Sequence, residues 1–408
     1  MSVRSALALC AVVALIGASA AAAGPGMYFG AAEDSAKSLD PMIAKAKMDL
    51  AQLAGFDVVR LTAIWRPGET ELEGQQRIEL ENAAAAANLN GIRVIVAVYH
   101  YGSLTTPVKV DDRRDFAAFV GSIARGLPSV KDFIIGNEPN LNRFWMPQFN
   151  RNGSSASPAA YLGLLALTYD ELKAISYDIR VIGGSVSPRG NDNPGGKRHT
   201  HSPYRFIRQL GVAYRRSGRP RPVMDAFAFH PYGDHSSQPP EFQHAAGVNR
   251  IGISEYDRLL ELLAEAFDGT AQPGSELPVV YDEYGVEAQI PSAKRRAYKG
   301  REPKTTRPVN EATQARYYRN ALHFAACQHT VEGILLFHVS DEPDLDRWQS
   351  GIFYADDTPK LSLRLVRETM TELRSATAAE RHAGGASYVG VDCPAATAPA
   401  RTGPRSGR

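Results

Sequence analysis

The sequence predicts an α/β protein of one domain, folded as a (β/α)8 TIM barrel. Eight short runs rich in apolar and β-branched residues recur along the chain, and stretches with helical periodicity separate them. The main alternative is an open doubly wound sheet, which usually has a glycine-rich phosphate loop after its first strand. No such loop occurs here, so the closed barrel is favoured.

The runs predict strands that alternate with helices along most of the chain. Most runs are almost continuously hydrophobic, as expected for strands that are buried on both faces. Helices are predicted at residues 45–53, which Gly55 terminates, and at 159–175 and 256–267. Because the chemistry of such barrels lies at the carboxyl ends of the strands, functional residues are expected there. The eight predicted strands are residues 26–31, 57–64, 93–100, 132–136, 180–185, 224–230, 278–282 and 331–339.

The two ends of the chain are predicted to lie outside the barrel, which would occupy residues 25–375. Residues 1–24 resemble a secretory signal peptide, with an apolar run at 6–16 and an Ala-Ser-Ala cleavage site at 18–20. This run is short for a membrane span, so we expect cleavage and a secreted or extracytoplasmic protein. Residues 376–408 are rich in Ala, Gly, Pro, Arg and Ser and are expected to form a flexible tail.

Composition excludes several classes of protein. The 408 residues are 44% hydrophobic and 22% charged, which is too apolar for a chain that is disordered throughout. The formal net charge of +2 gives no global field that would attract nucleic acid or an anionic membrane. We therefore expect no nucleic-acid partner and no stable membrane association after removal of the signal.

The cysteines and histidines predict no metal site or cofactor. The chain has three cysteines, of which Cys10 lies in the signal. Export would allow Cys327 and Cys393 to pair, but the sequence leaves open whether they do. No spacing typical of zinc ligands is found for the histidines near the strand ends, which are His199, His201, His230 and His235.

Polar and aromatic residues gather where the predicted strands end. Aromatic faces pack against the apolar C–H faces of sugars, so the positions of the three tryptophans suit a glycan cleft. Each residue alone has an ordinary explanation as a loop or core residue, and the combination carries the argument. The residues singled out are Arg60, Trp65, His100, Asn137, Glu138, Trp145, His230, Tyr232, Glu283, Phe337 and Trp348.

Glu138 and Glu283 follow the fourth and seventh runs and can face each other across the barrel mouth. Two carboxylates so placed can cleave a glycosidic bond if one is protonated and the other is ionised. Asn137 can hydrogen-bond a sugar 2-hydroxyl. Arg60 or a protonated histidine would favour the ionised form of Glu283, and Tyr232 could donate a hydrogen bond to that carboxylate.

These residues resemble the motifs of clan A of the retaining glycoside hydrolases. The order Arg60, His100, Asn137-Glu138, His230-x-Tyr232 and Glu283 is most similar to glycoside hydrolase family 5, and family 39 is also possible. The resemblance implies that Glu138 is the acid/base and Glu283 the nucleophile. One position departs from family 5, because Phe337 stands where that family has a sugar-stacking tryptophan. Either Phe337 or Trp348 would take over its role.

The expected function is therefore an exported glycoside hydrolase that cleaves O-glycosidic bonds, β-linked by the resemblance, with retention of configuration. Its partner would be an oligo- or polysaccharide. Two alternatives stay open, namely a barrel that binds glycan without cleaving it and a transglycosylase that uses the same residues. A basic loop at 294–307 and a polar loop at 189–205 could hold an acidic sugar or an anionic polymer, although such loops are more often simply solvated.

Overall fold

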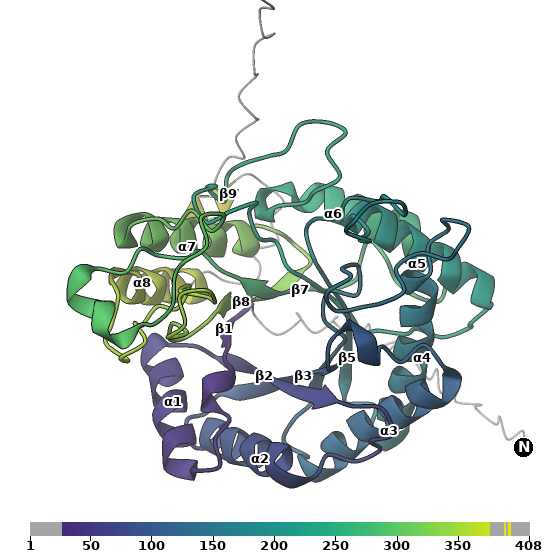
Figure 1. Cartoon of the computed structure of the whole chain (residues 1–408), viewed down its shortest axis with the longest axis horizontal. Coiled ribbons are helices and arrows are strands. Elements are labelled where there is room, and N and C mark those ends of the chain that lie inside the picture. Colours follow the sequence, from purple (N-terminus) through teal and green to yellow (C-terminus); the bar gives the residue numbers. More distant parts are fainter. Residues whose placement is uncertain (1–26, 376–386, 389–390, 393–408) are drawn as a thin grey trace, which may run out of the picture.

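The computed structural model of the chain describes residues 27–375, 387–388 and 391–392. Eight parallel strands form a closed barrel in sequence order, and helices surround it (Figure 1). The predicted (β/α)8 fold is thus confirmed. The barrel strands are β1 Tyr28–Ala32, β2 Val58–Trp65, β3 Arg93–His100, β4 Asp132–Ile135, β5 Arg180–Val186, β6 Ala226–Phe229, β7 Val279–Tyr284 and β8 Val331–Phe337.

The helices that follow the strands cover the outside of the barrel. The predicted helix 256–267 matches α6, and 45–53 and 159–175 fall within longer helices. The helices are α1 Pro41–Ala54, α2 Gly74–Leu89, α3 Val110–Gly126, α4 Ser157–Ile175, α5 Pro203–Ser217, α6 Tyr256–Phe267, α7 Glu311–Ala326 and α8 Leu361–Ser375. Beyond them, β9 (Ser387–Tyr388) pairs antiparallel with β10 (Val391–Asp392).

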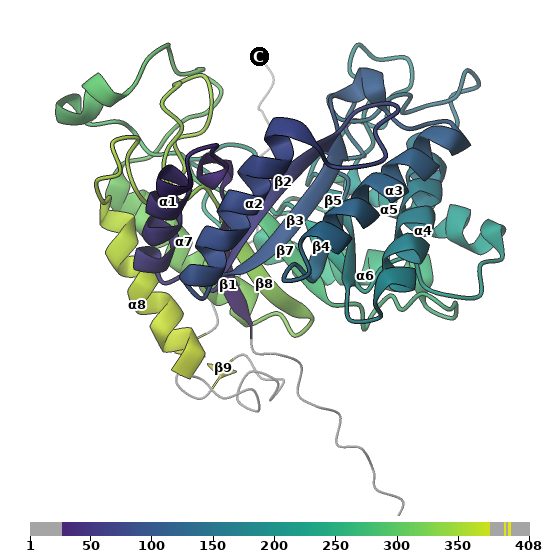
Figure 2. The same cartoon turned by 90° about the horizontal axis from the view of Figure 1, so that it is seen from below.

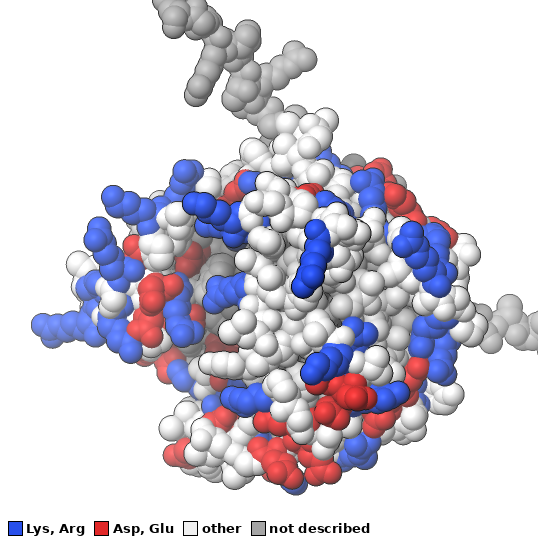
Figure 3. All heavy atoms as spheres, turned by 45° about the vertical axis from the view of Figure 1, so that its right-hand side comes forward, with Lys and Arg blue, Asp and Glu red and all other residues white. Residues whose placement is uncertain are grey.

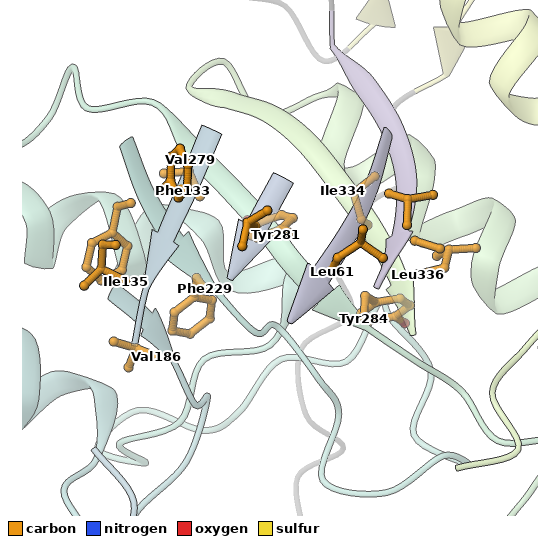
Figure 4. Packing of buried hydrophobic residues seen from close by; sticks show 14 of the residues in the cluster. Leu61, Phe133, Ile135, Val186, Phe229, Val279, Tyr281, Tyr284, Ile334 and Leu336 are labelled. Carbon is orange, nitrogen blue, oxygen red and sulfur yellow. The ribbon is translucent and has the colours of Figure 1, made fainter. Parts of the chain in front are cut away.

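Alternate residues of each strand point into the barrel or out toward the helices. Val58, Ala228 and Val280 belong to the buried cluster inside the barrel. Leu61 and Tyr281 belong to the larger cluster between strands and helices, part of which Figure 4 shows. Because side chains alternate with a period of two, the residues two places after the interior ones form the next layer up. That layer contains Arg60, His230 and Asp282, and it is polar.

The long loops gather at one end of the barrel, where the strands finish (Figure 2). The loops after β6, β7 and β8 are among the longest and surround the polar layer. The face drawn in Figure 3 carries basic and acidic side chains in separate small groups, without one field of a single sign. Among the described residues no helix is long and apolar enough to span a bilayer.

The predicted signal peptide and most of the predicted tail, with Cys10 and Cys393, lie outside the described residues. Cys327, at the end of α7, is disulfide-bonded. This settles the state of Cys327; the sequence left open whether it pairs with Cys393, and Cys393 lies outside the described residues.

Candidate active site

Glu138 stands just after β4 in an uncommon backbone conformation. Gly136 precedes it with a φ of 88°, and a Cβ atom there would lie 2.9 Å from the Tyr161 ring. Glu138 has a φ of 39° and Ser185, near the end of β5, a φ of 48°. Left-handed conformations of such residues cost about 1–3 kcal/mol each and cluster at functional sites. The Glu138 amide donates to the Ser185 carbonyl over 2.8 Å, so the two segments support each other.

Glu283, within β7 near its end, accepts hydrogen bonds from Arg60, near the start of β2, and from Tyr232, which follows β6. Arg60 Nη1 donates to Glu283 Oε1 over 2.6 Å, and the Tyr232 hydroxyl donates to Oε2 over 3.1 Å. Arg60 also donates through Nη2 to Asn137 Oδ1 over 3.3 Å. The guanidinium is almost fully buried, so its charge acts on Glu283 with little screening by water.

His230 connects the two carboxylates. Its Nδ1 atom lies 3.2 Å from Glu138 Oε1 and 3.5 Å from Glu283 Oε2. The imidazole is fully buried, whereas the side chains of Glu138 and Glu283 are 15% and 14% exposed. Both carboxylates therefore lie around one ring nitrogen, and both can be reached from the barrel mouth.

A buried polar network lies directly below this pair. His230 Nε2 lies 2.9 Å from Ser185 Oγ and 3.2 Å from Asp282 Oδ1, and Ser185 Oγ donates to Asp282 Oδ2 over 2.9 Å. Arg60 Nε is 3.8 Å from Asp282 Oδ2. Asp282 and Ser185 were not among the predicted site residues. A carboxylate inside an otherwise apolar strand was the available signal, since a buried charge requires a partner.

The charges in this network support one another. Burial opposes ionisation of His230, but Glu283 and then Asp282 outweigh it and raise the pKa of His230 well above its usual value. Burial would raise the pKa of Asp282, but the charges of His230 and Arg60 and the Ser185 hydrogen bond lower it overall. His230 is therefore an imidazolium at neutral pH, able to donate from both nitrogens.

An aromatic group lies beside Glu283. The Tyr232 and Trp348 rings are 5.3 Å apart at 32°, and the Phe337 ring meets Trp348 edge-on at 5.2 Å. Burial and the charges of Glu283 and Glu138 raise the pKa of Tyr232 well above its usual value, so its hydroxyl stays a donor. Both residues considered as replacements for the missing tryptophan thus lie at the site. The peptide bond between Phe337 and His338 is cis.

Three predicted site residues lie away from the carboxylates. Trp65 and Trp145 are essentially fully buried, so neither ring presents a face to a sugar. Trp65 packs against Phe116 with a centroid distance of 5.7 Å, and its Nε1 donates to the Glu69 carbonyl over 2.7 Å. The expectation that these two tryptophans line the cleft is corrected, because both rings fill the packing between barrel and helices.

His100 is also placed differently from the expectation that it binds substrate. Its Nε2 contacts the Phe144 carbonyl, and the ring meets Trp145 edge-on at 5.4 Å. Burial lowers the pKa of His100 to about 4, so the ring is neutral and holds the loop after β4. Within residues 27–375, no cluster of three or more His, Cys, Asp or Glu side chains is arranged to hold a metal ion.

No protein-family model matches the sequence, and no curated protein resembles it significantly. Solved structures do resemble the fold. A family 39 glycoside hydrolase from Bacteroides cellulosilyticus has a TM-score of 0.61 and 17% identity, over 86% of this chain and 65% of that one. A GH5_18 enzyme from Streptomyces cattleya, in complex with Manb1-4GlcNAc, has a TM-score of 0.58 and 15% identity, over 86% and 82%.

A β-glucosidase from Exiguobacterium marinum has a TM-score of 0.55 and 12% identity, over 86% of this chain and 98% of that one. At such identities the similarity establishes the shared barrel fold. These neighbours are glycoside hydrolases and include members of families 5 and 39, the two that the sequence resembles. The chain spans about two thirds of the length of the family 39 structure.

Proposed function

We propose that the chain is a retaining glycoside hydrolase in which Glu283 is the nucleophile and Glu138 the acid/base. The observation that carries the proposal is the unequal environment of the two carboxylates. Glu283 faces Arg60, Tyr232 and His230, whereas Glu138 faces His230 among these donors. The hydrogen bonds from Arg60 and Tyr232 hold the Glu283 carboxylate in one orientation, as a group that must attack a carbon atom requires. Glu138 is left as the group that takes up and gives a proton.

The placement of the pair around His230 Nδ1 supports retention. Retaining enzymes hold their carboxyl groups about 5–5.5 Å apart, close enough for direct attack on the anomeric carbon. Inverting enzymes need a wider gap that admits a water molecule. A shared ring nitrogen at 3.2 and 3.5 Å favours the close arrangement. Glu283 would attack the anomeric carbon while Glu138 protonates the leaving oxygen, and Glu138 would then activate the water that releases the sugar.

Export completes the proposal, since the first 24 residues read as a secretory signal. The substrate would then be an extracytoplasmic oligo- or polysaccharide. Structural neighbours include enzymes described as β-xylosidase, as β-glucosidase and as bound to Manb1-4GlcNAc. We accordingly propose a β-linked glycan as substrate.

The proposal is tested with the mature protein on aryl β-glycosides and on β-glucans, mannans and xylans. We expect cleavage by the wild type and losses of about 10³-fold or more in Glu138→Gln and Glu283→Gln. The matched control is Glu265→Gln, which alters an exposed carboxylate paired with Arg208 on the outside of the barrel. NMR of the first product should show the anomeric configuration of the substrate.

Two outcomes would contradict the proposal. Activity that survives in Glu283→Gln would remove the nucleophile assignment, and an inverted product would remove the retaining mechanism. Glycan binding without turnover by the wild type would instead favour a binding protein.

An added test separates the roles of the two glutamates. Azide should restore turnover of an activated aryl glycoside in Glu138→Ala with a retained glycosyl azide as product, because glycosylation of Glu283 does not need an acid when the leaving group is good.

A further inference from the structure

A cavity of about 580 Å³ opens beside the proposed nucleophile. Tyr232 and Trp348 form part of its wall, and the Tyr232 hydroxyl also donates to Glu283. Residues 284–287, which directly follow Glu283, form another part. A glycan bound at the carboxylates would therefore extend into this cavity.

Five arginines reach this cavity from four different loops. They are Arg143 after β4, Arg189 and Arg198 after β5, Arg250 after β6 and Arg347 after β8. These loops are far apart in the sequence, so no local sequence pattern places their positive charges in one hollow. The convergence is a property of the folded barrel mouth.

Carboxylates do not balance these charges. The acidic lining residues are Asp234, Glu287 and Asp346. Asp234 is already paired with Arg250. Burial, helped by the nearby charge of Glu302, raises the pKa of Glu287 to about 8, so Glu287 is mostly uncharged at neutral pH. The cavity is therefore net positive when the enzyme works near neutrality.

Three of the arginines lack an acidic partner. Within residues 27–375, Arg143, Arg189 and Arg198 form no ion pair; Arg189 donates to the Asp234 carbonyl over 3.2 Å and Arg143 lies over the Phe144 ring. Some exposed arginines elsewhere on the barrel, such as Arg216 and Arg367, also form no ion pair with the described residues, so the three are distinguished by lining the same hollow. Unpaired guanidinium groups around one hollow repel each other, and a bound anion would relieve that repulsion.

We propose that the cavity binds an anionic glycan, in which sugar units next to the cleaved bond carry a carboxylate or another oxyanion. This inference rests on the proposed function, since it names the substrate class of the same site. Guanidinium groups bind carboxylate, sulfate and phosphate through two parallel N–H···O bonds. Trp348 offers an aromatic face for the sugar ring. The arginines bind the charged groups while the aromatic wall holds the ring beside Glu283.

The test measures binding to full-length Glu283→Gln by calorimetry, so that ligands stay intact. The ligands are polyuronate oligosaccharides, the same oligosaccharides after carboxyl reduction, and sulfated oligosaccharides of equal length. We expect the charged forms to bind at least tenfold more tightly than the carboxyl-reduced forms. Raising NaCl from ~0.02 M to ~0.5 M should weaken that binding, because exposed charges are screened. Preference between carboxylate and sulfate would distinguish the two sources of the oxyanion.

Variants locate the effect in the cavity. In the Glu283→Gln background, Arg143→Ala with Arg198→Ala should reduce affinity for the charged ligand about tenfold or more. Arg364→Ala, which removes a paired arginine from the outside of α8, should leave it unchanged. Equal affinity for charged and carboxyl-reduced ligands, or no change in the double variant, overturns the inference. Failure of the proposed function looks different: the wild type would then cleave no glycoside while charged ligands still bind through the arginines.

Discussion

His230 is the residue on which the charges of the site depend. Its two nitrogens face opposite sides, with both proposed catalytic carboxylates on Nδ1 and the buried Asp282 and Ser185 on Nε2. Without Asp282, the imidazolium would lose the anion that faces Nε2. The orientation of the ring, and with it the spacing of Glu138 and Glu283, therefore depends on a residue that never touches substrate.

Asp282→Asn tests this positioning role. Removing one partner of a buried ion pair costs about 3–5 kcal/mol, so we expect lower thermal stability. The raised pKa of His230 depends partly on Asp282, and its loss should move the alkaline limb of the kcat/KM profile to lower pH. Asp170→Asn is the control, because it breaks ion pairs with Arg219 and Arg221 away from the site. An unchanged pH profile with reduced stability would leave Asp282 a purely structural residue.

At the scale of elements, the loop between β6 and α6 is held by a buried glutamate. Glu255 accepts hydrogen bonds from the Gly252 amide over 2.7 Å and from the His244 amide over 2.8 Å. Its Oε2 also lies 2.7 Å from His244 Nδ1, while His244 Nε2 is 3.6 Å from Asp234 Oδ2. This loop supplies Arg250 and Asp234 to the arginine-lined cavity. Its stability therefore affects the shape of the proposed glycan site.

His244 makes that stability depend on pH. Burial opposes its charge, but Asp234 and Glu255 raise the pKa of His244 from 6.5 to about 9. Because the folded pKa is the higher one, this contribution is complete below pH 6.5 and is lost as the pH rises through 9. His244→Gln should cost about 2–3 kcal/mol at acidic pH and much less above pH 9. Calorimetric unfolding of both proteins from pH 6 to pH 10 checks this, and a pH-independent difference would contradict it.

The elements also show how far the sequence alone could lead. All eight strands were predicted, because the runs buried on both faces are almost continuously apolar, and the predicted and observed ends differ by at most a few residues. The predicted strand at 224–230 extends beyond β6 at both ends. Buried residues continue past the last residues that pair with β7, and burial is what the sequence pattern reports. Glu138, Glu283, Asn137, His230 and Tyr232 were predicted together because polar residues at strand ends converge in a closed barrel. Arg60 was predicted with them, although it lies near the start of β2 and reaches Glu283 through its long side chain.

The remaining site residues could not be predicted, for physical reasons. Trp65 and Trp145 follow strands like the others, and only three-dimensional packing decides that their rings point into the core. The pairing of Asp282 with Ser185 joins β7 to β5, which are distant in the sequence. The convergence of arginines from four loops likewise depends on the path of each loop, about which composition says little.

At the scale of the whole molecule, the arrangement of residues at the proposed catalytic end of the barrel depends on the pairing of the first strand with the last. In β1, Tyr28 to Ala32 pair with Gly333 to Phe337 of β8, and Gly30 pairs with Val58 of β2. Phe337 at the site is thus held in register by β1. The geometry of the site therefore depends on closure of the barrel, because each strand that carries a functional residue is paired with a neighbouring strand on both sides.

Gly30→Ala tests how tightly this closure is packed. A Cβ atom at position 30 would lie 2.2 Å from the Val58 carbonyl oxygen and 2.9 Å from Leu335 Cδ2, so β1 would have to move from both of its neighbours. Backbone cannot yield as a flexible side chain can, and we expect a loss of about 3 kcal/mol with a lower midpoint of thermal unfolding. Gly126→Ala, at the end of α3 with open space around the new methyl group, is the control and should be neutral or slightly stabilising. If Gly30→Ala unfolds at the wild-type temperature, β1 is not clamped between β2 and β8. If it unfolds early and also weakens glycan binding below its melting temperature, closure of the barrel and order at the site are coupled as the register implies.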